Sequence, residues 1–163
     1  MRSLTLLTLA LSLNLLVFGC GGDSNKSGSA GEHVHVAPHG GQLVEVGEHG
    51  SGYNLELVLH PDGFLQIYVL DAHAENFVRI STPSIEIELS GEDNASRTLL
   101  CEPVADPATG ETVGNTSLFT STERITDLLP LQGVIPQFQL MEIVYENIAF
   151  EFSGNSGHAD HEH

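Results

Sequence analysis

Alternation of apolar and polar residues over positions 53–71 is the feature that most constrains the fold. In the segment YNLELVLH, every second residue from Tyr53 to Leu59 is apolar. In an extended strand such residues share one face, which can then be buried. A strong tight-turn signal, Pro61-Asp62-Gly63, follows, and the alternation resumes in FLQIYVL. The pattern predicts an antiparallel hairpin with one apolar face.

Similar short apolar segments recur through the rest of the chain. Further strands are predicted at 42–46, 77–80, 84–90, 97–102, 116–120, 138–144 and 147–152, the last two forming a hairpin across Tyr145-Glu146. Ser121-Thr122-Glu123 is a capping sequence for one short helix near 122–129, ended by Pro130. Short strands at this spacing predict an all-β domain over 32–152, either an antiparallel β-sandwich or a partly open barrel.

The first 31 residues have the composition of an export signal and a tether. Arg2 gives a positive start, and residues 4–18 are nearly all apolar but fall short of the ~20 residues of a spanning helix. The run ends at Gly19-Cys20, which resembles the bacterial lipoprotein signal. The resemblance implies that residues 1–19 are removed and that Cys20 carries acyl chains. Residues 20–31 then form a flexible linker, rich in Gly and Ser.

These features predict a protein anchored by lipid in a bacterial cell envelope. We expect it in the outer membrane, facing the periplasm, or at the cell surface. A soluble secreted protein with a stray cysteine is the alternative. With Cys20 acylated, Cys101 is the one other mature thiol, so no intramolecular disulfide is expected. Cys101 follows two leucines and is predicted to be a small buried hydrophobe.

The net charge is strongly acidic, −17, from 5 Lys+Arg against 22 Asp+Glu. Such a surface repels nucleic acid and anionic lipid headgroups and attracts cations, although acidic charge also simply maintains solubility. The chain has no GxSxG, HExxH or P-loop sequence. We therefore expect a protein that is not an enzyme and does not bind nucleic acid. A mononuclear metal oxidase with histidine ligands on a β-scaffold is the one enzyme alternative left open.

Histidines near the start of the predicted domain form the first candidate metal site. His33 and His35 are two residues apart, so in an extended segment both rings lie on the same side, roughly 7 Å apart at their Cα atoms. One ion can bridge such a pair, with His39 and Glu32 as further ligands. Neutral imidazole is the commonest side-chain ligand for zinc, copper and nickel.

Strand register adds a second expectation about histidines. If Val46 pairs with Tyr53, paired residue numbers in the first hairpin sum to about 99, and a two-residue Asp62-Gly63 turn gives about 125 in the second. His39 then lies opposite His60 at one end of the strands. His49 and His73 lie near each other at the opposite end. Singly, His49, His60 and His73 are more often surface or turn residues.

The last residues, 153–163, lack core residues and are predicted to be a disordered tail. Their histidines, with Asp160 and Glu162, form either a movable chelator or a solvated acidic tail. The complete set of candidate metal ligands is His33, His35, His39, His60, His158, His161 and His163.

Several segments together resemble a known family. APHGGQLVEV, YNLELVLH, FLQIYVLDAHAE and the late IAFEF strand are similar to the β-rich metal-binding region of periplasmic adaptor subunits of heavy-metal efflux systems. The resemblance implies a metal-binding domain in which His39 is the residue matched by motif. The chain lacks the long coiled-coil hairpin of an adaptor, so pump assembly is not implied.

The sequence thus favours a lipid-anchored extracytoplasmic protein that buffers, senses or hands on a divalent or cuprous metal ion, zinc or copper. Its expected partners are metal ions, the membrane through Cys20, and a metal-efflux or metal-handling protein. The alternative is a cell-envelope interaction module in which the histidines have no metal role.

Overall fold

The computed structural model describes residues 35–90 and 96–155, apart from the side chain of Ser96. The predictions about the signal peptide, Cys20, the linker, His33 and the tail histidines concern residues outside this part. Eight strands are described: β1 (Gln42–Val46), β2 (Tyr53–Leu59), β3 (Phe64–Leu70), β4 (Ile85–Ser90), β5 (Ser96–Pro103), β6 (Leu118–Arg124), β7 (Leu131–Leu140) and β8 (Ile143–Phe152). Among these residues, none forms a helix long and apolar enough to cross a membrane.

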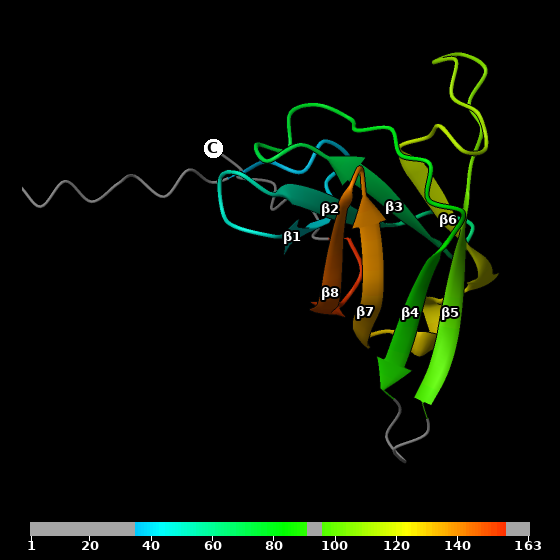
Figure 1. Ribbon diagram of the computed structural model, residues 1–163. Coiled ribbons are helices and arrows are strands. Elements are labelled where there is room, and N and C mark those ends of the chain that lie inside the picture. Colours follow the sequence, from blue (N-terminus) through cyan, green and yellow to red (C-terminus); the bar gives the residue numbers. More distant parts are fainter. Residues whose placement is uncertain (1–34, 91–95, 156–163) are drawn as a thin grey trace, which may run out of the picture. The chain divides into compact units, whose positions relative to one another are not determined.

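All eight strands belong to one antiparallel sheet, in the order β1-β2-β3-β6-β5-β4-β7-β8 (Figure 1). The sheet curls so that its two end strands, β1 and β8, come near each other. The Gln42 side chain donates to the Glu151 carbonyl, and the Tyr145 ring meets the Tyr53 ring edge-on at 6.5 Å. Asn155 also exchanges two hydrogen bonds with the backbone of Leu59. The all-β expectation is confirmed, as a nearly closed barrel.

The interior of the barrel is filled by apolar side chains that alternate along the strands. Leu55, Leu57, Ile67, Phe119 and Phe138 are fully or almost fully buried. Burial of this kind supplies most of the folding free energy, about 25 cal/mol for each Å² of apolar surface removed from water. The histidines therefore lie on a framework whose core does not depend on them.

Cys101 is fully buried in this core, as predicted. Burial raises the pKa of its thiol to about 12. The thiol is thus neutral and shielded, which makes it a packing residue and not a metal ligand.

The predicted hairpin across Tyr145-Glu146 is wrong. The turn lies at Met141-Glu142, where Leu140 pairs with Ile143. Met141 has a φ of 56°, a conformation usually marked by Gly or Asn, so the sequence gives no turn signal there. Asn147 also has a positive φ, 55°, but it lies within β8.

Two other predicted elements differ from the structure. The short helix near 122–129 is only a 3-10 turn, Thr126–Leu128, because residues 122–124 continue β6. Residues 77–80 form no named strand and make two isolated bridges, Leu70 with Phe77 and Ile80 with Thr116. The predicted turn over 91–94 lies outside the described residues.

The register prediction is correct in the first hairpin and one residue off in the second. Val46 pairs with Tyr53, as expected. Leu59 pairs with Leu65, not with Gln66, because the His60 amide bonds to the Phe64 carbonyl and leaves a three-residue loop. The C-terminal ends of β1 and β3 nevertheless lie beside the start of β2, at the same end of the strands. The loops that follow β1 and β3 are therefore close together.

Candidate metal-binding site

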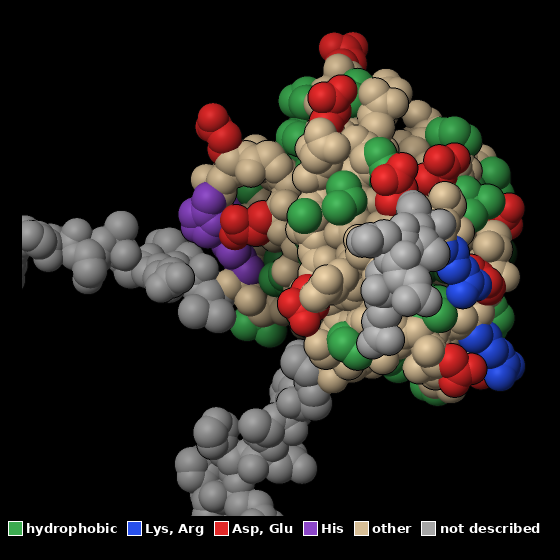
Figure 2. All heavy atoms as spheres, turned by 90° about the horizontal axis from the view of Figure 1, so that it is seen from below, with side chains coloured by type: hydrophobic (Ala, Val, Ile, Leu, Met, Phe, Trp, Pro, Cys, Tyr) green, Lys and Arg blue, Asp and Glu red, His purple; other side chains and the backbone are tan. Residues whose placement is uncertain are grey.

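Three histidines from three separate segments meet beside the loops that follow β1 and β3. His35 precedes β1, His49 lies in the turn between β1 and β2, and His73 lies in the loop after β3. The His35 ring centroid is 5.7 Å from that of His49 and 5.8 Å from that of His73. Histidines gather at one edge of the face shown in Figure 2, next to acidic side chains. The register argument placed His49 and His73 near each other, and the structure places both against His35.

The hydrogen bonds of this cluster leave one nitrogen available on two of the three rings. His35 Nδ1 lies 3.1 Å from the carbonyl oxygen of His73, and His49 Nδ1 lies 2.7 Å from Glu45 Oε1. Both partners are acceptors, so each Nδ1 must carry the proton to make the bond. Nε2 then keeps its lone pair. A backbone carbonyl or carboxylate at the other ring nitrogen is the usual arrangement around metal-ligating histidines.

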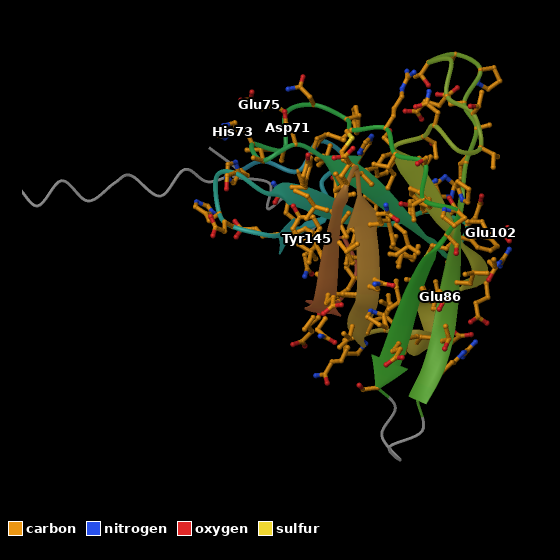
Figure 3. The ribbon with its side chains drawn as sticks, in the orientation of Figure 1. Asp71, His73, Glu75, Glu86, Glu102 and Tyr145 are labelled. Carbon is orange, nitrogen blue, oxygen red and sulfur yellow. The ribbon has the colours of Figure 1, made fainter. Side chains whose placement is uncertain are left out.

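The loop that carries His73 is held by one carboxylate, Asp71 (Figure 3). Asp71 accepts hydrogen bonds from the amides of His73 and Glu75, at 3.2 and 2.9 Å, and from the Asn76 side chain. Slight burial acts to raise the Asp71 pKa, but the hydrogen bonds from Asn76, Glu75 and His73 outweigh it and lower the pKa. Asp71 therefore stays ionised at neutral pH and keeps the loop ordered.

Asn54, on β2, is hydrogen-bonded to the backbone of the same loop. Its side-chain amide donates to the carbonyls of Asp71 and Ala72, at 3.0 and 3.1 Å. Its Oδ1 atom is buried and has no hydrogen-bond partner among the described residues. Asn54 also lines a small hollow together with Glu45 and His49. A buried acceptor beside the cluster is one more oxygen that can bond a water molecule there.

The charge around the cluster is not neutralised by arginine. Of the described residues, Arg79 pairs with Glu111, Arg97 pairs with Glu123, and Arg124 lies over the Phe64 ring. None of these arginines is paired with an acidic residue near His49 or His73. Glu45, Glu48, Asp71 and Glu75 thus give this edge of the protein a negative potential that attracts cations.

His39 occupies a separate position, over the outer face of β2. Its Nδ1 lies 2.8 Å from Glu56 Oε2, and its ring stacks on Tyr68 with a centroid distance of 3.9 Å. The Phe77 ring lies 5.6 Å from it. Burial and then the negative charge of Glu56 raise the pKa of Tyr68. No pattern in the sequence points to Glu56, which by alternation belongs to the solvent side of β2.

His39 and His60, predicted to lie opposite each other, have different partners in the structure. His60 Nδ1 accepts from the Asp62 amide at 3.3 Å, within its own turn. The prediction assumed that β1 extends back to His39. Instead, the chain turns over residues 37–40, where the Gly40 amide bonds to the Ala37 carbonyl, and this turn directs His39 onto Glu56.

The cluster is not a finished metal site. Over residues 35–90 and 96–155, no group of three or more His, Cys, Asp or Glu side chains has the arrangement needed to hold a metal ion. Of the predicted ligands, His35 belongs to the cluster, His39 and His60 lie apart with their own carboxylates, and His33, His158, His161 and His163 are outside the described part. His49 and His73 were not among the predicted ligands, although the predicted strand register placed them near each other.

Comparisons with known proteins add no family to this description. No protein-family model matches the chain, and neither the curated proteins nor the solved structures contain a match. The resemblance to metal-efflux adaptors therefore stays a prediction from the sequence, and the case for function depends on the residues themselves.

Proposed function

We propose that this protein binds a divalent transition-metal ion, its cargo, through His35, His49 and His73. The observation that carries the proposal is the gathering of these three imidazoles around His35, at centroid distances of 5.7 and 5.8 Å. Two of the rings have Nδ1 bonded to an acceptor, which leaves Nε2 as the ligand nitrogen. Both features favour metal binding over an incidental surface cluster.

His35 and each of its two neighbouring rings need only small movements to share an ion. Nitrogen ligands lie about 2.0–2.1 Å from zinc in a tetrahedral site, which puts the centroids of two bound imidazoles about 5 Å apart. The His35 ring is a little farther than that from each of the other two rings. His49 and His73 are exposed and lie in loops, so rotation of their side chains can close the difference. Water completes the coordination, because Glu45 is bonded to Nδ1 on the opposite side of the His49 ring.

The donor set indicates which ions fit. Imidazole nitrogen suits Zn²⁺ and Cu²⁺, whereas Cu⁺ prefers thiolate or thioether sulfur. The Cys101 thiol is buried and neutral, and so supplies no sulfur to the site. An exposed site of this kind exchanges its ion readily, which suits a protein that buffers or hands on zinc or copper.

The place of action follows from the sequence of the first 31 residues. A lipoprotein-like signal ending at Cys20 and a Gly- and Ser-rich linker support attachment to the bacterial cell envelope. A metal-efflux or metal-handling protein is the partner that would receive the ion. Radiolabelled fatty acid incorporated by cells expressing the wild type, but not Cys20→Ala, tests the anchor. Equal labelling of the two proteins would contradict it.

Metal titration of the full chain tests the proposal. Isothermal titration with Zn²⁺ or Cu²⁺ at pH 7.5 is expected to give micromolar or tighter binding for the wild type. The triple variant His35→Ala, His49→Ala, His73→Ala is expected to bind at least tenfold more weakly. The matched control is His60→Ala, whose histidine lies outside the cluster. On a background in which His158, His161 and His163 are replaced by Ala, equal affinities for the triple variant and the control would reject the site.

The tail needs its own control, because its histidines are also candidate metal ligands. A variant with His158, His161 and His163 replaced by Ala separates the two sources. If this change alone abolishes binding, the ion belongs to the tail and not to the barrel. If it leaves one tight site, that site belongs to the rest of the chain, and the triple variant built on this background assigns it.

An interaction module is the second candidate, and one observation favours it. At the β7–β8 turn, Met141, Ile143 and Val144 are 58%, 53% and 47% exposed. Adjacent exposed apolar side chains are typical of contact surfaces. Under this alternative, replacing the cluster histidines leaves cellular metal tolerance unchanged, whereas replacing these three residues by Ser disrupts a complex with an envelope protein.

A further inference from the structure

Glu56 is a charged residue buried completely in the middle of β2. Leu55 and Leu57, on either side of it, fill the barrel, so Glu56 faces the outside of the sheet. It is buried because the chain segment 37–41 lies over it. Gly41 approaches β2 so closely that a Cβ atom there would lie 2.7 Å from Val58 Cγ2 and 2.9 Å from Glu56 Cγ. The segment is therefore packed against the sheet, and not loosely draped over it.

The Glu56 carboxylate accepts three hydrogen bonds, all from this one segment. Its Oε1 accepts from the amides of His39 and Gly41, at 2.7 and 3.0 Å. Its Oε2 lies 2.8 Å from His39 Nδ1. Removing a carboxylate from water is costly unless its oxygens are satisfied in this way. Moving the segment away from β2 would break these three hydrogen bonds. Glu56 therefore holds residues 37–41 against β2.

The bound segment leads directly to His35. Pro38 has a restricted φ, and the Gly40 amide closes a turn on the Ala37 carbonyl at 3.1 Å, so the path from His39 back to His35 is short and stiff. Val36, between them, is 75% exposed and contributes little anchoring. The hydrogen bond described for the His35 side chain is the single one to the His73 carbonyl.

The His39 ring also touches the loop that carries His73. It lies against Tyr68 at the end of β3 and against Phe77, where the loop returns to pair with Leu70. His39 thus contacts two parts of the protein that adjoin the cluster. Its Nδ1 is bonded to the buried Glu56 carboxylate, and its ring packs against Tyr68 and Phe77, which flank residues 71–76.

We propose that Glu56 is a positioning residue for the metal-binding cluster, holding His35 against His49 and His73 through its three hydrogen bonds to the His39–Gly41 turn. This inference rests on the proposed function of the cluster. Glu56 itself does not touch the ion.

The test compares variants of the full chain carrying Ala at His158, His161 and His163. Glu56→Gln keeps an oxygen for the two amides but removes the carboxylate oxygen that faces His39 Nδ1. Gly41→Ala displaces the turn from β2 without changing any charge. Glu111→Gln is the matched control, because Glu111 is another buried carboxylate, bonded to the Thr116 and Ser117 hydroxyl groups and to no residue of the cluster.

Two measurements are made on each variant. Zinc affinity from titration is expected to fall about tenfold in Glu56→Gln and in Gly41→Ala, and to stay within twofold in Glu111→Gln. In the metal-free protein, nuclear Overhauser contacts between the His35 and His73 ring protons are expected to weaken in the first two variants alone. If the variants acted only by lowering the stability of the fold, Glu111→Gln would show the same changes as Glu56→Gln and Gly41→Ala.

Each result has a definite meaning. Unchanged zinc affinity in Glu56→Gln overturns the inference, whether or not the ring contacts weaken. If the wild type binds no zinc, the proposed function fails, and the ring contacts still decide whether Glu56 positions His35. If Gly41→Ala does not fold, the comparison of Glu56→Gln with Glu111→Gln is sufficient.

Discussion

His39 Nδ1 lies 2.8 Å from Glu56 Oε2, so a histidine at the protein surface is bonded to a carboxylate that is fully buried. This pair connects the rigid barrel to the segment that precedes it. The ring is held on its flat side by Tyr68, and the carboxylate also takes two backbone amides. The same chain segment carries His35, the central ring of the proposed metal site.

Metal affinity should depend on pH. Ligand histidines must be neutral, so protons compete with the ion and the affinity falls as the pH is lowered. Titration at pH 7.5 and 5.5 should show at least tenfold weaker zinc binding at the lower pH. Affinity that is flat over this range would indicate that carboxylates, and not imidazoles, hold the ion.

The ionisation of Tyr68 should report the charge of Glu56. Burial and the Glu56 carboxylate both raise the Tyr68 pKa, because each disfavours the phenolate. In Glu56→Gln the charge contribution disappears, and the pKa should move down towards the ordinary value of 10.0. Carbon-13 titration of the ring measures it, and Glu111→Gln should leave it in place. An unchanged value in Glu56→Gln would mean that Glu56 is uncharged in the wild type.

The core should become less stable in alkali because of Cys101. Its folded pKa of about 12 is above the ordinary value of 9.0, so the unfolded chain ionises first. The contribution is complete below pH 9 and is lost as the pH rises towards 12. At pH 10.5 the loss is about 2 kcal/mol. Urea unfolding of the wild type and of Cys101→Val at pH 8 and 10.5 measures it, and equal losses in both proteins would refute it.

The position of the β7–β8 turn should be visible in stability. Met141 has a φ of 56°, which costs an L-residue about 1 kcal/mol relative to glycine. Met141→Gly should therefore stabilise the protein by up to about 1 kcal/mol. Glu142→Gly, whose residue is not in this conformation, should destabilise it. Thermal unfolding of both distinguishes this turn from one at Tyr145-Glu146.

Most of the fold could be predicted from the alternation of apolar and polar residues in the strands and from the residues typical of turns. The hairpin from Tyr53 to Leu70 was predictable because a period of two separates the buried face from the exposed face, and Pro61-Asp62-Gly63 marks the reversal. The β7–β8 turn was not predictable, since Met141 adopts a left-handed conformation without a glycine to signal it. Turn-forming residues identify an ordinary turn in the sequence. A turn that forms without such residues, like the one at Met141-Glu142, has no local signal.

The sequence by itself determined an all-β chain, either a sandwich or a partly open barrel, and identified its histidines as candidate ligands, because side-chain period and residue type are local properties. Only the tertiary structure decided that His35 meets His49 and His73, and that His39 rests on Glu56 and not beside His60. Those contacts depend on where the segment before β1 crosses the sheet. That crossing is fixed by a buried carboxylate and a close glycine contact between residues far apart in the chain.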